Sequence, residues 1–218
     1  MKLLVLIFTW VIAINSSAFA ESSSDSKRVS DWRFGVGLGY SPLLTLNLKG
    51  TDTEAGTGNT YHNIVELEYK GSAAFSLTAW RTPQNSWGFV SGYEYTGQRE
   101  LKKVTVNGLS STNIQSSSKY QVQNVYVGTA YRWENLFIPL ALNYTFVFFQ
   151  PAPLSVGTVE VKNGVGAHLG LGWFLGDNFV IEFLGRSALT ELNMSDSTGT
   201  SKNEGTIASS SLLLSFQY

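Results

Sequence analysis

Eight charged residues recur on one side of a two-residue alternation that runs through most of this 218-residue chain. Four are acids and four are bases, so they can form ion pairs with one another. If these residues face the interior of a closed β-sheet, they can serve in one of two ways. They can form a paired network that fills the interior, or they can line a polar path for ions and small solutes. The paired network is favoured, because side chains just fill a small barrel. The eight residues are Arg33, Glu66, Glu68, Lys70, Glu94, Arg132, Glu182 and Arg186.

Residues that could support catalysis do not gather at one site. A lipid hydrolase needs a serine, a histidine and an acid together on a membrane-exposed surface. His168 lies on the charged side of the alternation, beside Gly166 and Gly170, and His62 shares that side with Glu66. We therefore expect no catalytic residues. With two histidines and no cysteine, the sequence also predicts no metal site and no cofactor.

Two glycine-rich runs, 35–39 and 164–172, could suggest nucleotide binding. A phosphate-binding loop leads into a helix, and no helical pattern follows either run. The glycines lie on the same side as the charges, where small residues relieve crowding in a narrow interior. The balance of 15 basic and 16 acidic residues also argues against nucleic acid as a partner, because phosphate binding needs clustered Lys and Arg.

The first thirty residues differ from the rest of the chain. Residues 1–20 have a basic start at Lys2, an apolar core over 3–14 and an Ala18-Phe19-Ala20 cleavage pattern, and they predict a signal peptide. The apolar core is too short to span a membrane as a helix. Residues 21–30 are rich in serine and predict a flexible tail. The remainder, 31–218, is expected to form one domain.

From residue 31 onward, apolar and polar residues alternate, which is typical of strands with one apolar face. Leu44, Leu46 and Leu48 continue the apolar face of the first strand. One face of the second strand carries Val65, Leu67, Tyr69, Ala73, Phe75 and Leu77. Polar, glycine-containing stretches at 49–60, 104–119, 150–163 and 193–205 predict long loops, and short turns fall between them. The alternation predicts an up-and-down antiparallel meander of eight strands at about 32–48, 61–80, 87–103, 120–133, 136–148, 164–173, 179–189 and 206–218.

The charges decide which face looks outward. A soluble barrel would bury all eight in a dry core, at a cost of several kcal/mol for each unpaired ion. A transmembrane β-barrel instead turns its apolar face to lipid and keeps polar residues inside. Aromatic residues near the short-turn ends of the strands support the membrane barrel, because such residues anchor strands at membrane interfaces. These are Trp32, Trp87, Trp133, Trp173, Phe216 and Tyr218, with Trp80 near them; Tyr61, Tyr95, Tyr120, Phe146 and Phe148 fall toward the long-loop end.

The last strand, 206–218, reads TIASSSLLLSFQY and ends the chain on an aromatic residue. With the eight-strand pattern, it resembles the small eight-stranded outer-membrane proteins of Gram-negative bacteria, the OmpX, OmpW and OmpA-barrel class. The resemblance covers 31–218. It implies an outer-membrane location with short periplasmic turns and four long extracellular loops. It also implies outer-membrane lipid and lipopolysaccharide as surroundings, and recognition of the C-terminal strand by the barrel-assembly machinery.

Three functions are consistent with this resemblance. The first is a non-catalytic protein with a largely plugged lumen, which stabilises the envelope and presents its loops for adhesion or recognition, with a possible extracellular ligand. The second, by resemblance to OmpW, is a narrow channel for small or apolar solutes. The third, which the scattered histidines disfavour, is a lipid-modifying enzyme.

Overall fold

The structure is a computed structural model that describes residues 32–82, 85–112, 118–150 and 157–218. The predicted signal peptide at 1–20 and the tail at 21–30 lie outside the described residues. All regular secondary structure in the described residues is β-strand. None of it is a helix long and apolar enough to cross a membrane.

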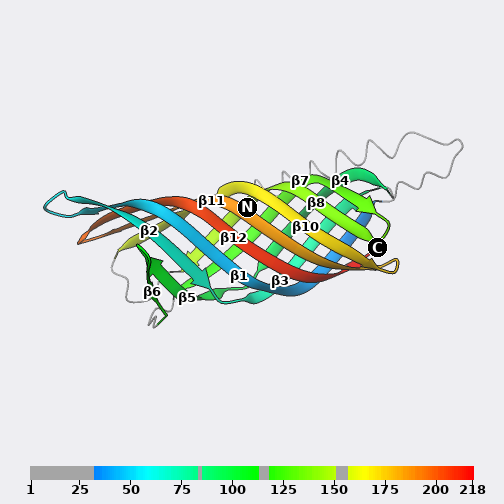
Figure 1. Cartoon of the computed structure of the whole chain (residues 1–218), viewed down its shortest axis with the longest axis horizontal. Helices are drawn as coiled ribbons and strands as arrows, with labels where there is room; N and C mark the ends of the chain where they lie inside the picture. Colours follow the sequence, from blue (N-terminus) through cyan, green and yellow to red (C-terminus); the bar gives the residue numbers. More distant parts are fainter. Residues whose placement is uncertain (1–31, 83–84, 113–117, 151–156) are drawn as a thin grey trace, which may run out of the picture.

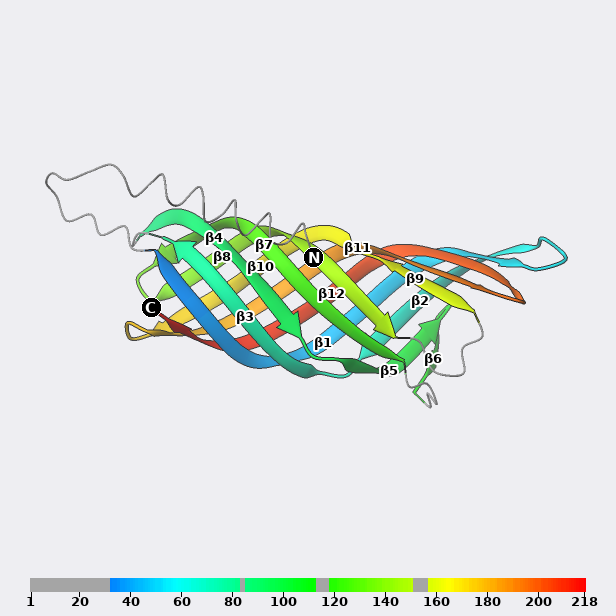
Figure 2. The ribbon, with the colours of Figure 1, turned by 180° about the vertical axis from the view of Figure 1, so that it is seen from behind.

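The strands form one antiparallel sheet that closes into a barrel (Figures 1 and 2). They are β1 (Arg33–Glu54), β2 (Thr60–Tyr69), β3 (Ser72–Arg81), β4 (Ser86–Thr96), β5 (Arg99–Val106), β6 (Leu109–Ser111), β7 (Lys119–Trp133), β8 (Leu136–Gln150), β9 (Thr158–Lys162), β10 (Gly164–Leu175), β11 (Phe179–Asp196) and β12 (Gly199–Gln217).

These strands make eight passes along the barrel. β2 with β3, β4 with β5, and β9 with β10 are each one pass interrupted by a one- or two-residue break, and β6 is a short extra strand folded back on β5. The predicted eight-stranded antiparallel barrel is therefore confirmed. The first and last strands close the ring: Phe34 N donates to Tyr218 O at 3.1 Å, and Tyr218 N donates to Phe34 O at 3.0 Å. Closure leaves no open edge in lipid, where unpaired backbone groups are costly.

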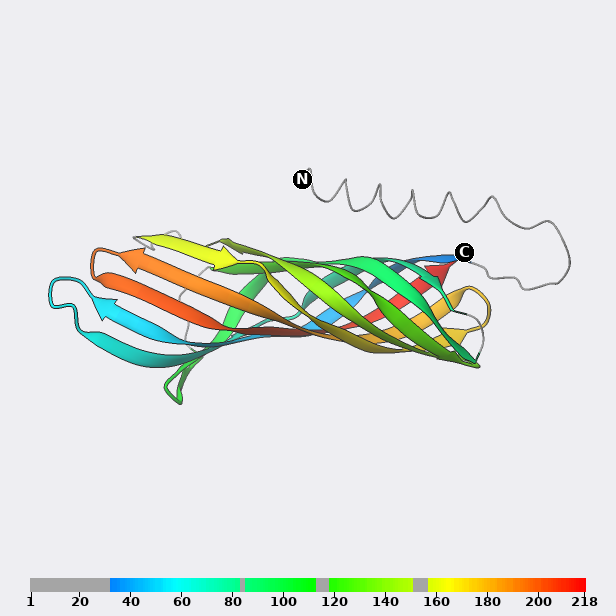
Figure 3. The same ribbon diagram turned by 90° about the horizontal axis from the view of Figure 1, so that it is seen from above.

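Two of the four predicted long loops are mostly strand. β1 runs to Glu54 and β12 starts at Gly199, so 49–60 and 193–205 form long hairpins with short connections. The two hairpins reach beyond the other strands at one end of the barrel (Figures 1 and 3). Ala55 N donates to Thr198 O at 2.8 Å, which joins the two tips. The polar composition of these stretches reflects exposure to water rather than loop structure.

Four passes switch faces part-way along, which the sequence alternation did not reveal: β1, β2 with β3, β4 with β5, and β9 with β10, where Val161 and Gly164 both lie inward. In β1 an extra residue lies between Tyr40 and Leu43, and this bulge turns the following side chains to the other face. Leu44, Leu46 and Leu48 are consequently buried inside the barrel, so their predicted outward placement is wrong. Leu43, just before them, is exposed.

The breaks at 70–71 and 97–98 have the same effect on the next two passes. Val65, Leu67 and Tyr69 pack against the buried leucines of β1, whereas Phe75 and Leu77 of the same pass face outward. The prediction that these residues share one face is therefore wrong. At Gly71 a Cβ atom would overlap the outer end of the Tyr40 ring, so a larger residue there would require that ring to move.

The face switches divide the barrel into two halves with different interiors. The short-turn half has lumen side chains that are mostly polar or aromatic, and the long-hairpin half encloses an apolar cluster around Leu44, Leu46, Tyr69 and Tyr120. The short-turn half comprises 33–43, 72–81, 86–96, 124–133, 136–145, 164–175, 179–189 and 209–217. The long-hairpin half comprises 44–54, 60–69, 99–111, 119–123, 146–150, 158–162, 190–196 and 199–208.

Candidate functional site

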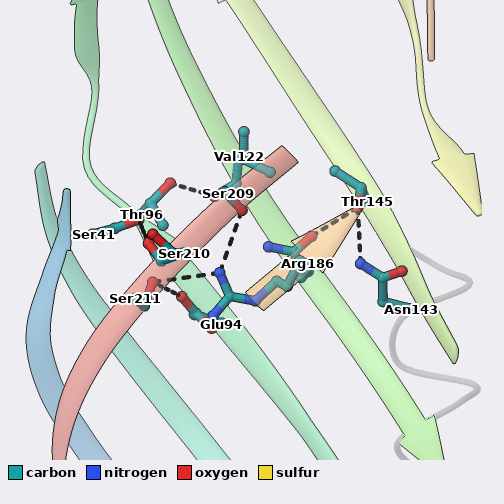
Figure 4. Close-up of polar contacts among 11 residues, drawn as sticks. Ser41, Glu94, Thr96, Val122, Asn143, Thr145, Arg186, Ser209, Ser210 and Ser211 are labelled. Atoms are coloured by element: carbon teal, nitrogen blue, oxygen red, sulfur yellow. Dashed lines mark hydrogen bonds and ion pairs between the residues drawn. The ribbon is translucent and has the colours of Figure 1, made fainter. Parts of the chain in front are cut away.

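A buried ion pair crosses the lumen of the short-turn half. Glu94 extends inward from β4 and Arg186 from β11, and their side chains are 0% and 2% exposed. Arg186 Nη2 donates to Glu94 Oε2, and Ser211 Oγ donates to Glu94 Oε1 at 2.7 Å (Figure 4). Arg186 Nη1 also contacts the hydroxyls of Ser209 and Ser211 at 3.4 and 3.3 Å. β4, β11 and β12 thus hold one charge of each sign at the centre of the barrel.

Neutral polar side chains continue this layer across the lumen. Thr145 Oγ1 donates to Asn124 Oδ1 at 2.7 Å, and Asn143 Nδ2 donates to Thr145 Oγ1 at 3.3 Å. The His168 ring stacks on the Tyr126 ring, with centroids 4.1 Å apart, and is fully buried. Hydrogen-bonded and stacked side chains from β4, β7, β8, β10, β11 and β12 thus lie together at this level of the lumen.

An aromatic layer lies nearer the short turns. Trp80, Phe137 and Phe174 pack with ring centroids 5.0 to 6.3 Å apart, and Trp80 Nε1 donates to Gln217 Oε1 at 2.5 Å. The space between these rings, Val180 and Glu182 has no room for a water-sized sphere.

Two arginines cover this aromatic layer. The guanidinium of Arg33 lies 5.5 Å from the Trp80 ring centroid, and that of Arg132 lies 4.5 Å from the Phe174 ring centroid. Arg33 Nη1 also donates to Asp177 O at 2.9 Å, in the turn between β10 and β11. Cation–π contacts of this kind are favourable and hold the two charges at the mouth of the lumen.

The structure does not bring all eight predicted charges together. Glu94, Glu182 and Arg186 are buried in the lumen, and Arg33 and Arg132 lie at its short-turn end. Glu66, Glu68 and Lys70, predicted to lie in the same network, are on the outer face, because the break at 70–71 turns them away from the lumen.

On that outer face two of these charges form separate ion pairs. Lys70 Nζ donates to Glu100 Oε2 at 2.8 Å, and Lys103 Nζ donates to Glu68 Oε1 at 3.2 Å. The hydrogen bond from Lys70 and its positive charge lower the pKa of Glu100. These pairs link the β2–β3 pass to β5 and are exposed or partly exposed, so each contributes little to stability.

Sequence reasoning missed Arg99. Because Gly97 and Gln98 interrupt the pass, Thr96 and Arg99 both point inward, and Arg99 is 1% exposed. Its Nη1 donates to Ser41 O at 3.2 Å, at the level where the polar and apolar interiors meet. The Gly97-Gln98 dipeptide was the available signal, because a glycine inside a strand pattern often marks a break.

Comparison with known proteins decides the class of the fold. No protein-family model and no curated protein matches the sequence. Among solved structures, the outer membrane protein OprG from Pseudomonas aeruginosa aligns with a TM-score of 0.56 at 12% identity, over 87% of this chain and 97% of OprG. The outer membrane protein AlkL aligns with a TM-score of 0.55 at 11% identity, over 91% of this chain and 95% of AlkL.

This chain has the fold of the small outer-membrane β-barrels. As in the OmpX and OmpW class predicted from sequence, the ring has eight strands, and its short turns and long connections lie at opposite ends. The outer face of the short-turn half is apolar, which suits a lipid-facing wall, and that of the long-hairpin half is mostly polar. The orientation predicted from the sequence puts the long-hairpin half, called the extracellular half below, outside the membrane.

Most of the predicted interface aromatics lie on the outer wall of the outer-membrane barrel. Trp87, Trp133, Trp173, Phe216 and Tyr218 are exposed near the short turns or the chain end, and Trp32 is half-buried with its ring 5.7 Å from that of Phe89. Trp80 and Tyr120, which the sequence also placed in the two aromatic belts, are instead inside the barrel. Both occupy inward positions of their strands, which aromatic type alone did not distinguish.

Proposed function

We propose that this outer-membrane barrel is a non-catalytic, non-conducting surface protein that stabilises the envelope and presents its extracellular half for adhesion or recognition. The observation that carries the proposal is the filled lumen. The aromatic layer at Trp80, the ion pair between Glu94 and Arg186, and the apolar cluster around Leu46 follow one another along the barrel. A barrel filled in this way is expected not to conduct ions.

The extracellular half supports the second part of the proposal. It has its own apolar core, and hydrogen bonds join its two long hairpins at their tips. At the β11–β12 turn, Asp196 Oδ1 accepts hydrogen bonds from the backbone N–H groups of Thr198 and Gly199 and from the Thr198 hydroxyl. These bonds lower the pKa of Asp196. A scaffold braced in this way holds exposed side chains in fixed positions, which suits a binding surface.

Two measurements test the proposal. Refolded protein in a planar bilayer is expected to show no discrete openings, and reproducible openings that change in Glu94→Gln would contradict it. Cells that display the protein are expected to bind host or neighbouring cells more than cells displaying a variant in which a short turn replaces 50–62. Equal binding by both would remove the surface-presentation role.

A second candidate function is a route for small apolar solutes. A split in the barrel wall favours this function. The hydrogen-bonded ladder between β8 and β10 ends at Thr145 and Gly164. Beyond that point, among the described residues, β9 pairs with β11 alone. Val147 N donates to Asn163 Oδ1 at 2.9 Å where the strands separate. Phe149 of β8 and Val159 of β9 are on the two strands that border this split, and both pack against the apolar cluster around Leu46.

Uptake of a small radiolabelled hydrocarbon by whole cells separates the two functions. The apolar route predicts faster uptake in cells that produce the protein, and loss of that increase in Val159→Arg. Equal uptake with and without the protein would leave the closed surface barrel as the better account.

A further inference from the structure

A hollow of about 80 Å³ lies on the barrel at the junction of β4, β5, β7 and β8. β7 pairs with β5 through Arg99–Tyr120 and Glu100–Lys119 on one side and with β8 up to Lys119–Gln150 on the other, so the hollow lies beside the first residues of β7. The hollow is lined by Gln98, Lys119, Gln121, Phe148, Phe149 and Gln150.

The hollow is at the level where the outer wall changes from apolar to polar. Phe148 is 49% exposed and continues the lipid-facing row of Leu140, Leu142 and Tyr144 along β8. Directly across from Phe148 on β7 is Gln121, and Lys119 and Gln150 lie one step further toward the outside. A molecule in the hollow would therefore touch apolar side chains below and polar side chains above, as a lipid headgroup does at the membrane surface.

The polar side chains of the hollow are suited to an anion. Lys119 is exposed, and no carboxylate of the described residues forms an ion pair with it. The nearest acid along the row is Glu100, and its carboxylate is already hydrogen-bonded to Lys70. The row Lys70, Glu100, Lys119 thus carries one excess positive charge. The amide groups of Gln98, Gln121 and Gln150 supply further N–H donors.

We propose that this hollow binds the phosphorylated headgroup of a lipid in the outer leaflet. The Lys119 ammonium and the glutamine amides contact the phosphate, and Phe148 packs against the first part of the acyl chains. Basic pockets at membrane surfaces recognise anionic headgroups through this combination of charge and hydrogen bonding.

The test uses the full mature protein, refolded in phosphatidylcholine vesicles with or without a small fraction of diphosphorylated lipid A. The readout is the midpoint of thermal unfolding as a function of lipid A content. Lipid A is expected to raise the midpoint in the wild type, and Lys119→Gln is expected to lower the apparent affinity about fivefold, the effect of one basic side chain at an anionic membrane surface. Lys119→Arg keeps the charge and is expected to retain the shift.

Lys202→Gln is the matched control, because Lys202 is also an exposed lysine of the extracellular half but lies on β12, away from the hollow. It is expected to behave as the wild type. Three outcomes would each overturn the proposal: an equal shift in Lys119→Gln, an equal shift with dephosphorylated lipid A of the same acyl chains, or an equal shift with inorganic phosphate alone. The last would assign the hollow to a free anion.

Discussion

The two halves of this barrel use opposite polarity along the same strands. In the short-turn half, exposed side chains such as Leu38 and Leu214 face lipid, and buried ones such as Glu94 and Ser215 are polar. In the long-hairpin half, Leu46 and Ile207 are buried, and the outer face is mostly polar, with Ile64, Phe146 and Phe148 as exceptions. The solvent around each half, lipid or water, decides which face must be apolar.

The strands reach this reversal in two ways. β1, the two following passes and the β9–β10 pass change face through the bulge after Tyr40 and the breaks at 70–71, 97–98 and 163. β7 keeps its alternation and changes residue type: Tyr126 and Asn124 line the polar lumen, whereas Val122 and Tyr120 line the apolar one. One fold can therefore hold a membrane barrel and a water-facing β-structure end to end.

Removing one partner of the central ion pair is expected to have the largest effect. Arg186→Met leaves the Glu94 carboxylate buried without its cation, which costs about 3–5 kcal/mol of unfolding free energy. Denaturant unfolding in lipid vesicles, followed by tryptophan fluorescence, measures the loss. The double variant Glu94→Gln with Arg186→Met is expected to recover most of it, and equal losses in the single and double variants would contradict a buried charge pair.

Leucine deletions on β1 compare the two halves directly. Leu46→Ala empties part of the closed extracellular core and is expected to cost about 2–5 kcal/mol. Leu38, 66% exposed on the outer face of the same strand, is its matched control, because lipid chains fill the space that Leu38→Ala leaves. Comparable losses for the two variants in the same unfolding experiment would contradict the reversal of polarity.

The outer ion pair between Glu68 and Lys103 is expected to matter least. Both side chains are partly exposed to water, so Glu68→Gln should change the unfolding free energy by about 0–1 kcal/mol. The small effect should shrink further in high salt, where exposed pairs are screened. Glu66→Gln on the same strand is the control. A loss as large as that of Arg186→Met would place Glu68 in the lumen.

The sequence predicted the ring of eight strands and the facing of β7, β8, β10, β11 and β12, because their two-residue alternation is unbroken. It failed for Leu44 to Leu48 and for Glu66 to Lys70 for one physical reason. A single added residue inverts every later side chain of a strand. Leucine is equally suited to a lipid-facing wall and to a closed core, so residue type did not indicate which face Leu44 to Leu48 occupy.

Thiol accessibility tests the central claim of opposite polarity most directly, because the chain has no cysteine of its own. Leu46→Cys and Glu68→Cys would be displayed on intact cells and treated with a membrane-impermeant maleimide. The account predicts rapid labelling of Glu68→Cys, and labelling of Leu46→Cys only after unfolding. Labelling of Leu46→Cys in the folded protein, with Glu68→Cys protected, would contradict the account. That result would support the unbroken alternation predicted from the sequence, with Leu46 on the outer face and Glu68 in the lumen.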